Sequence, residues 1–182
     1  MASYRAKRDS SRTPEPAGDS GRRPGGPVFV VQRHEASSTH FDFRLEIDGV
    51  LVSWAVPKGP SVDPDDRRLA IRTEDHPLGY ADFEGRIPQG EYGAGTVIVW
   101  DTGHFDVLTT GSARQALADG HLTVSLHGTK LAGGFSLIRR PSGPREQWLL
   151  LKKNDEGADR RRKPAETQPE SVVSDRTNKD FA

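Results

Sequence analysis

The sequence predicts an all-β fold of about eight or nine antiparallel strands with one short helix, arranged as a small barrel or a sandwich. Three observations favour this fold class. Nine short runs are rich in β-branched and aromatic residues. The 19 glycines and 13 prolines fall mainly between these runs, where turns are needed. Asp48-Gly49 separates two runs and is a strong signal for a two-residue hairpin turn.

The predicted strands follow one another through the central part of the chain. They are Val28–His34, His40–Ile47, Val50–Val56, Arg68–Glu74, Thr96–Asp101, His104–Leu108, Leu122–His127, Phe135–Arg139 and Gln147–Lys152. Only Ser112–Asp119 has a helical pattern, with Ser112 at the N-cap position and Gly120 after its last residue.

The two ends of the chain lack this pattern. Residues 1–26 are rich in Ser, Arg, Pro and Gly, which predicts a flexible arm. Residues 154–182 include the basic run Arg160–Lys163 and are predicted to be a solvated, disordered tail. We therefore expect one domain, formed by residues 27–153.

Composition excludes several classes of function. The chain has no cysteine, which excludes disulfides, thiolate metal sites and cysteine nucleophiles. Its 26 basic and 26 acidic residues cancel, so a nucleic acid would be bound by a local patch or at its end. No stretch approaches the ~18 apolar residues of a membrane span, and no signal peptide is evident. We expect a cytoplasmic protein without a membrane partner.

The run His40–Ile47 alternates strictly between polar and apolar residues, and neighbouring side chains of a strand point to opposite faces. The core face would carry Phe41, Phe43, Leu45 and Ile47. The other face would carry His40, Asp42, Arg44 and Glu46. Such a face is often simply solvated. Imidazole and carboxylate groups also bind divalent cations, however, and a guanidinium group grips phosphate, so this face suits a metal–phosphate site.

His34 lies at the end of the preceding predicted strand, six residues before His40. A neighbouring strand would bring it beside His40 and Asp42 and give a set of two histidines and one carboxylate. Taken alone, His34 would more often be an ordinary surface histidine.

The segment 68–74 repeats the alternation. Leu69 and Ile71 would face one way, and Arg68, Arg72 and Glu74 the other. The loop that follows contains His76, which would contact a phosphate or protonate a leaving group, unless it is an ordinary turn histidine.

The remaining candidates point to structure. Pro88–Gly95 is Gly-rich but lacks the Walker spacing and lysine, so it predicts tight turns and no nucleotide cradle. No role is assigned to His104, His121 or His127. Trp54, Trp100 and Trp148 are expected in the core.

Five blocks of sequence then suggest a family. They are Gln32–Glu46, Ser53–Pro60, Glu74–Pro77, Ile87–Gly95 and Trp148–Lys153. In this order and spacing they resemble the 3′-phosphoesterase module of bacterial DNA ligase D, and the resemblance covers about residues 5–153. It implies a compact β-barrel and a manganese-dependent (Mn2+) enzyme acting at the 3′ end of a primer strand on a DNA duplex. Such enzymes remove a terminal ribonucleoside and then the 3′-phosphate.

The resemblance also assigns roles to residues. The metal ligands would be His34, His40 and Asp42. The phosphate-contacting and transition-state groups would be Arg44, Arg68, His76 and Tyr80. Supporting positions would be Gln32, Lys58 and Glu74. In the arm, Arg8, Asp9 and Glu15 would favour removal of the ribonucleoside by closing over the strand end.

No ligase or polymerase motifs are present, which predicts a stand-alone version that relies on ligase and polymerase partners of end joining. Two rival functions stay open. His40-x-Asp42 with a distal histidine is the spacing of a non-haem iron oxygenase triad. A DNA-end-binding module without catalysis is the other.

Overall fold

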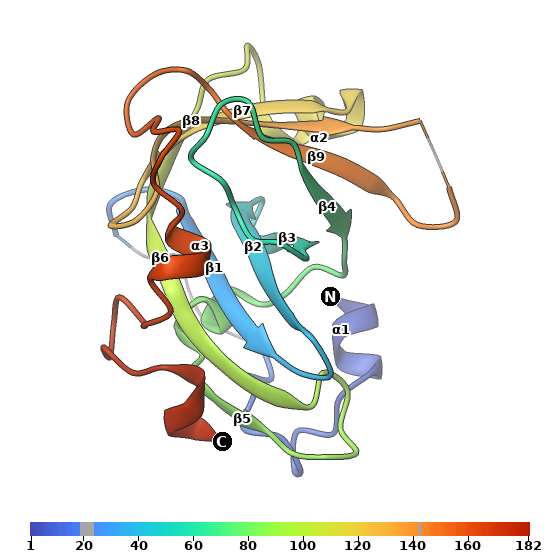
Figure 1. Cartoon of the computed structure of the whole chain (residues 1–182). Coiled ribbons are helices and arrows are strands. Elements are labelled where there is room, and N and C mark those ends of the chain that lie inside the picture. The colour runs from blue at the N-terminus through green and yellow to red at the C-terminus, as the bar shows by residue number, and fades with distance from the viewer. Residues whose placement is uncertain (19–23, 142) are drawn as a thin grey trace.

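The structure is a computed structural model that describes residues 1–18, 24–141 and 143–182. Eight antiparallel strands close a barrel in the order β1-β2-β3-β4-β9-β8-β7-β6, because β6 pairs back to β1, and β5 is added on β6 (Figure 1). The strands are β1 (Val28–Glu35), β2 (Thr39–Ile47), β3 (Val50–Val56), β4 (Arg68–Arg72), β5 (Gly85–Ile87), β6 (Gly95–Val107), β7 (His121–His127), β8 (Ala132–Arg139) and β9 (Gln147–Lys152). The predicted all-β barrel is confirmed.

The helices are short and lie outside the barrel wall. They are α1 (Ala2–Ala6), α2 (Ala113–Asp119), α3 (Pro164–Thr167) and the 3-10 helices η1 (Leu78–Asp82) and η2 (Asn178–Phe181). The predicted central helix is α2, where the Ser112 side chain accepts a hydrogen bond from the Gln115 amide. Among the described residues, no helix has the length and apolar character needed to cross a membrane.

A local sequence signal explains the turn between β2 and β3. Asp48 and Gly49 have φ values of 52° and 81°, the two positive values that a tight hairpin turn with right-handed twist needs. Two predicted strands are joined in β6, which continues from Gly95 to Val107. The three-residue strand β5 was not predicted, since a run this short carries no recognisable period.

The barrel core confirms the predicted inner face of β2. Phe41, Phe43 and Leu45 are buried in one apolar cluster together with all three tryptophans. On β4 the inner face is the one that carries Arg68 and Arg72, because Ala70 between them lies in this cluster, whereas Leu69 and Ile71 are only partly buried. Ala70 is paired with Trp148 across the strands, and both side chains are buried in this cluster.

A second apolar cluster covers the outer face of β1, β3 and β6. Val30, Leu51 and Val99 contribute from the strands, and Tyr4 and Tyr80 contribute from α1 and η1. The outer face of this part of the barrel is therefore buried beneath α1 and η1. The candidate site lies where these helices pack against the strands.

The C-terminal segment differs from the disordered tail that its composition predicted. Ser171 and Asn178 are fully buried, and the Trp100 Nε1 group donates a hydrogen bond to the Gln168 carbonyl at 2.6 Å. The Asn178 amide donates to the Arg33 and Thr96 carbonyls, joining η2 to β1 and β6 (Figure 1). Polar contacts to the barrel wall, which a hydrophobic pattern does not reveal, hold this segment.

Candidate metal and phosphate site

Two paired strands bring the predicted metal-binding residues together. In the register of β1 and β2, His34 lies opposite His40, and Gln32 lies opposite Asp42. One ligand atom from each of His34, His40 and Asp42 lies within 4.8 Å of the others. The two histidines, six positions apart in the sequence, are therefore neighbours across the sheet.

The Gly-rich loop orients His34. The Nε2 atom of His34 lies 2.8 Å from the Gly93 carbonyl, which can only accept, so Nε2 carries the proton. The lone pair is then on Nδ1, and this nitrogen lies 3.7 Å from an Asp42 oxygen. Such a hydrogen bond to the far nitrogen is the usual way in which a metal-binding histidine is held in one tautomer. Pro88–Gly95, predicted only as turns, thus supports the site.

Arg44 occupies the next outward position on β2. Its Nε donates to the Gln32 side chain at 2.8 Å, and Gln32 is fixed in turn by the carbonyls of Tyr80 and Phe83. The Nη2 atom lies 3.4 Å from the Asp42 carboxylate. The guanidinium group is thus buried and held in one orientation beside the three candidate ligands.

These contacts shift the ionisation of the candidate ligands. Burial alone would raise the pKa of Asp42, but the Arg44 charge and the contact with His40 outweigh it and lower this pKa well below its usual range. Burial would lower the pKa of His40, but the hydrogen bond to Asp42 outweighs it and raises this pKa. Asp42 is therefore a carboxylate at neutral pH, which is the form that a cation requires.

His76 and Tyr80 line the opposite side of the site. Burial and then the adjacent Arg44 charge lower the pKa of His76 well below its usual value, so its ring is neutral at pH 7. Its Nδ1 atom lies 2.9 Å from the Glu74 carbonyl and 3.1 Å from the Arg44 Nη1 atom, so the tautomer decides which contact is a hydrogen bond. Burial and the nearby Glu15 raise the pKa of Tyr80 well above its usual value, so its hydroxyl is a proton donor.

The N-terminal arm closes this side through ion pairs. The Arg8 Nε donates to both oxygens of Glu15 at 2.9 Å, and its Nη1 donates to Glu74 at 3.1 Å. The Tyr80 hydroxyl donates to Glu15 at 2.9 Å. Burial would raise the pKa of Glu74, but hydrogen bonds from Lys7 and Arg8 outweigh it and lower this pKa. A charged network thus connects the arm to the barrel.

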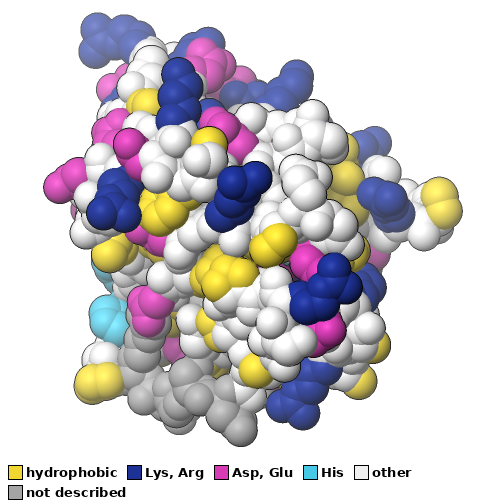
Figure 2. Space-filling view, turned by 90° about the horizontal axis from the view of Figure 1, so that it is seen from below, with side chains coloured by type: hydrophobic (Ala, Val, Ile, Leu, Met, Phe, Trp, Pro, Cys, Tyr) yellow, Lys and Arg dark blue, Asp and Glu magenta, His cyan; other side chains and the backbone are white. Residues whose placement is uncertain are grey.

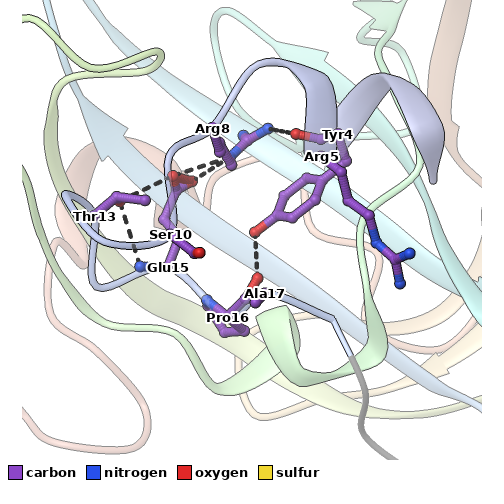
Figure 3. Close-up of a pocket in the computed structure, with 8 residues that line it drawn as sticks. All are labelled: Tyr4, Arg5, Arg8, Ser10, Thr13, Glu15, Pro16 and Ala17. Atoms are coloured by element: carbon purple, nitrogen blue, oxygen red, sulfur yellow. Dashed lines mark hydrogen bonds and ion pairs between the residues drawn. The ribbon is translucent and has the colours of Figure 1, made fainter.

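Within the arm, side chains from α1 and from the following loop point toward one another (Figure 3). Tyr4 donates to the Pro16 carbonyl at 2.7 Å, and its ring lies 5.0 Å from the ring of His76. Thr13 donates to Glu15 at 3.2 Å. The arm is folded back on itself and packs directly against a candidate catalytic histidine.

Most of the predicted site residues line one cavity of about 320 Å3. Its lining includes Arg8, Glu15, His34, His40, Asp42, Arg44, Glu74, His76 and Tyr80. Gln32 lies behind Arg44 and contacts it directly.

Besides Gln32, three predicted residues do not line this cavity. Arg68 lies two residues before Ala70 on β4, on the same face of the strand, and forms an ion pair with Asp66. Lys58 is exposed beyond the end of β3. Asp9 is exposed, and its carboxylate accepts hydrogen bonds from the amide and hydroxyl of Ser11, as in a turn.

Several contributors were not predicted from the sequence. Tyr92 lines the cavity, Tyr4 packs against His76, and Lys7 binds Glu74 at 2.7 Å. An exposed tyrosine in a Gly-rich loop was a signal for Tyr92. No comparable signal existed for Tyr4, because apolar residues do not recur at regular spacing in the segment around it.

Comparison with known proteins identifies the family of this chain. Residues 32–139 match the DNA ligase D 3′-phosphoesterase domain family. The multifunctional non-homologous end joining protein LigD of Pseudomonas aeruginosa is 50% identical over 182 residues, covering 97% of this chain and 21% of that protein. The corresponding DNA repair protein LigD of Mycobacterium tuberculosis is 49% identical over 150 residues, covering 82% and 19%. The chain spans about a fifth of the length of these curated relatives. It belongs to the DNA ligase D 3′-phosphoesterase domain family.

Proposed function

We propose that this protein is a metal-dependent phosphoesterase that heals the 3′ ends of DNA primer strands. It would remove a terminal ribonucleoside and then the remaining 3′-phosphate, leaving a 3′-hydroxyl for repair. One observation carries the proposal: a two-histidine, one-carboxylate cluster shares a cavity with a buried, oriented arginine and a neutral histidine. Membership of the family supports a role as a hydrolase in DNA end processing.

The donor set fits a divalent transition metal. His34, His40 and Asp42 offer two imidazole nitrogens and one carboxylate oxygen. The tie of His34 to the Gly93 carbonyl leaves its other nitrogen available. The family resemblance favours manganese. When bound, such an ion would act as a Lewis acid on a phosphate oxygen and make water a better nucleophile.

The protein side chains would do the rest. Arg44, held by Gln32, would neutralise charge on the phosphate oxygens without having to reorient. The Tyr80 hydroxyl, now bound to Glu15, is a second donor within the cavity. A phosphate in the cavity would add negative charge near His76 and raise its pKa. The ring could then carry a proton to the departing 3′-oxygen.

The charge distribution favours binding at a strand end. On the described part of the face in Figure 2, Lys and Arg side chains are scattered among acidic ones and form no continuous basic band. With 26 basic and 26 acidic residues overall, the chain has no net charge to hold a long duplex. The substrate would be a primer–template junction, and a ligase and a polymerase of end joining would act on the healed end. That task would place the protein in the cytoplasm, at the nucleoid.

The test uses a 5′-labelled primer that ends in one ribonucleoside, annealed to a longer template. With manganese, wild-type protein should first give a primer ending in a 3′-phosphate and then one ending in a 3′-hydroxyl. Asp42→Asn should give neither product. Binding of the primer without product would favour the non-catalytic end-binding module instead. Oxidation of a keto-acid with iron, and no phosphate release, would favour the oxygenase.

A further inference from the structure

Tyr92 combines two properties that no other described side chain shares. Four large hydrophobic side chains of the described residues are exposed: Tyr92, Leu108, Ile138 and Val173. Tyr92, which is 49% exposed, is the member of this set that lines the catalytic cavity. An open aromatic ring therefore stands at the edge of the cavity that contains the candidate metal ligands.

The ring is held in this place. The next residue, Gly93, accepts the hydrogen bond from His34, so the backbone beside Tyr92 is tied to a candidate metal ligand. The preceding residue, Glu91, forms an ion pair of 3.1 Å with Arg12 of the arm. The Lys7 Nζ atom lies 4.7 Å from the centre of the ring. Contacts on both sides of the loop thus fix Tyr92 while half of its surface stays open.

A second hollow begins at Tyr92. Tyr92, Thr73 and Glu74 line both this hollow and the catalytic cavity. The charged side chains of the second hollow are balanced in sign: Lys7, Arg72, Arg145, Glu74, Asp75 and Glu146. Balanced charge attracts a nucleic acid only weakly, whereas the aromatic surface of Tyr92 offers a nucleobase a stacking contact that does not depend on charge.

We propose that Tyr92 is the stacking surface for the nucleobase of the nucleotide whose 3′-phosphate enters the catalytic cavity. The inference rests on the proposed function and adds a subsite for the base. Stacking on an aromatic ring accepts every base, because every base has a π face. A general end-healing enzyme needs such tolerance, since the terminal base varies. The rival role for Tyr92 is to hold the arm through Lys7 and Arg8.

The test measures two variants of Tyr92 on two kinds of primer end. Tyr92→Ala and Tyr92→Phe are compared with wild type on a 3′-phosphate primer whose terminal nucleotide carries a base or is abasic. Leu108→Ala removes an equally exposed apolar side chain away from the cavity and is the control. We expect Tyr92→Ala to raise KM about 10-fold on the base-bearing end, the scale of one stacked base, with little change on the abasic end. Tyr92→Phe and Leu108→Ala should resemble wild type.

The outcomes separate the two proposals. An equal loss on both ends would assign Tyr92 to holding the arm and overturn the inference, as would no loss on either. Absence of phosphate release by wild-type protein would refute the proposed function instead. In that case, binding of a primer with terminal 2-aminopurine, without metal, still decides the inference. Fluorescence quenching by wild type that is lost in Tyr92→Ala supports stacking, and equal quenching by both proteins contradicts it.

Discussion

His34, His40 and Asp42 project from paired strands of the barrel wall, whereas Arg8 and Glu15 reach the same cavity from an arm without strand pairing. Backbone hydrogen bonds set the spacing of the first group. Side-chain contacts, such as the ion pair between Arg8 and Glu15, set the position of the second. We therefore propose that the barrel wall performs the chemistry, which needs fixed distances, and that the arm selects the strand end, which needs opening and closing.

The largest effect is expected in the wall. His40→Ala should lower the rate of phosphate release about 10³-fold or more, because one of three candidate metal ligands is lost. The protein should stay folded, since His40 lies outside the apolar core. Phosphate release and circular dichroism check both points. His121→Ala, at an exposed position on β7, is the matched control and should be fully active. A folded His40→Ala protein with near-normal activity would remove His40 from the site.

Arg44→Lys should lower the rate of phosphate release about 10²-fold, the scale for loss of one positioned charge stabiliser. Lysine keeps the charge but cannot donate to Gln32 and reach the phosphate with the same planar group. Single-turnover rates at saturating substrate measure this effect. Wild-type rates would show that the charge alone matters and that the orientation by Gln32 does not.

In the arm, Glu15→Gln should lower ribonucleoside removal about 10-fold and phosphate removal by much less. The change removes the charged partner of Arg8 and Tyr80 but leaves the strand residues in place. The measurement is the ratio of the two rates on matched primers. Equal losses of the two activities would mean that the arm stabilises the residues of the barrel wall. The proposed division of roles between wall and arm would then be wrong.

The smallest effect on activity is expected at the C-terminal segment, which lines no part of the cavity that holds the candidate metal ligands. Asn178→Ala should reduce the free energy of unfolding by about 1–3 kcal/mol, because its buried partners at Arg33 and Thr96 lose their hydrogen bonds. Activity per folded molecule should not change. Thermal unfolding of Asn178→Ala and of the exposed control Asn154→Ala tests this expectation. Equal stability of both variants would show that the segment contributes little.

The sequence predicted the wall much better than the arm. Strict alternation along β2 identified both its core face and its polar face, and the pairing of β1 with β2 followed from the short connection between His34 and His40. On β4 the alternation did not reveal which face is inner, because the core position there holds a small residue, Ala70, paired with Trp148. Apolar side chains on such a strand no longer mark the inner face.

Composition failed for a different reason at the two ends of the chain. The arm and the C-terminal segment are rich in polar residues, so a prediction from apolar content assigns them to flexible segments. In the structure, buried polar contacts such as Tyr80 with Glu15 and Lys130 with the Gln168 carbonyl hold them. These contacts join residues far apart in the chain, and no local pattern reveals such pairs.

The most direct test of the central claim is the dependence of phosphate release on manganese, measured with a 3′-phosphate primer–template. Wild-type protein freed of metal should be inactive and should recover activity with added manganese along a saturating curve. Asp42→Asn should need far more manganese or fail to recover, because it lacks the carboxylate that lies within 4.8 Å of both histidine ligand atoms. Full activity of metal-free wild-type protein, or an unchanged curve for Asp42→Asn, would contradict the account.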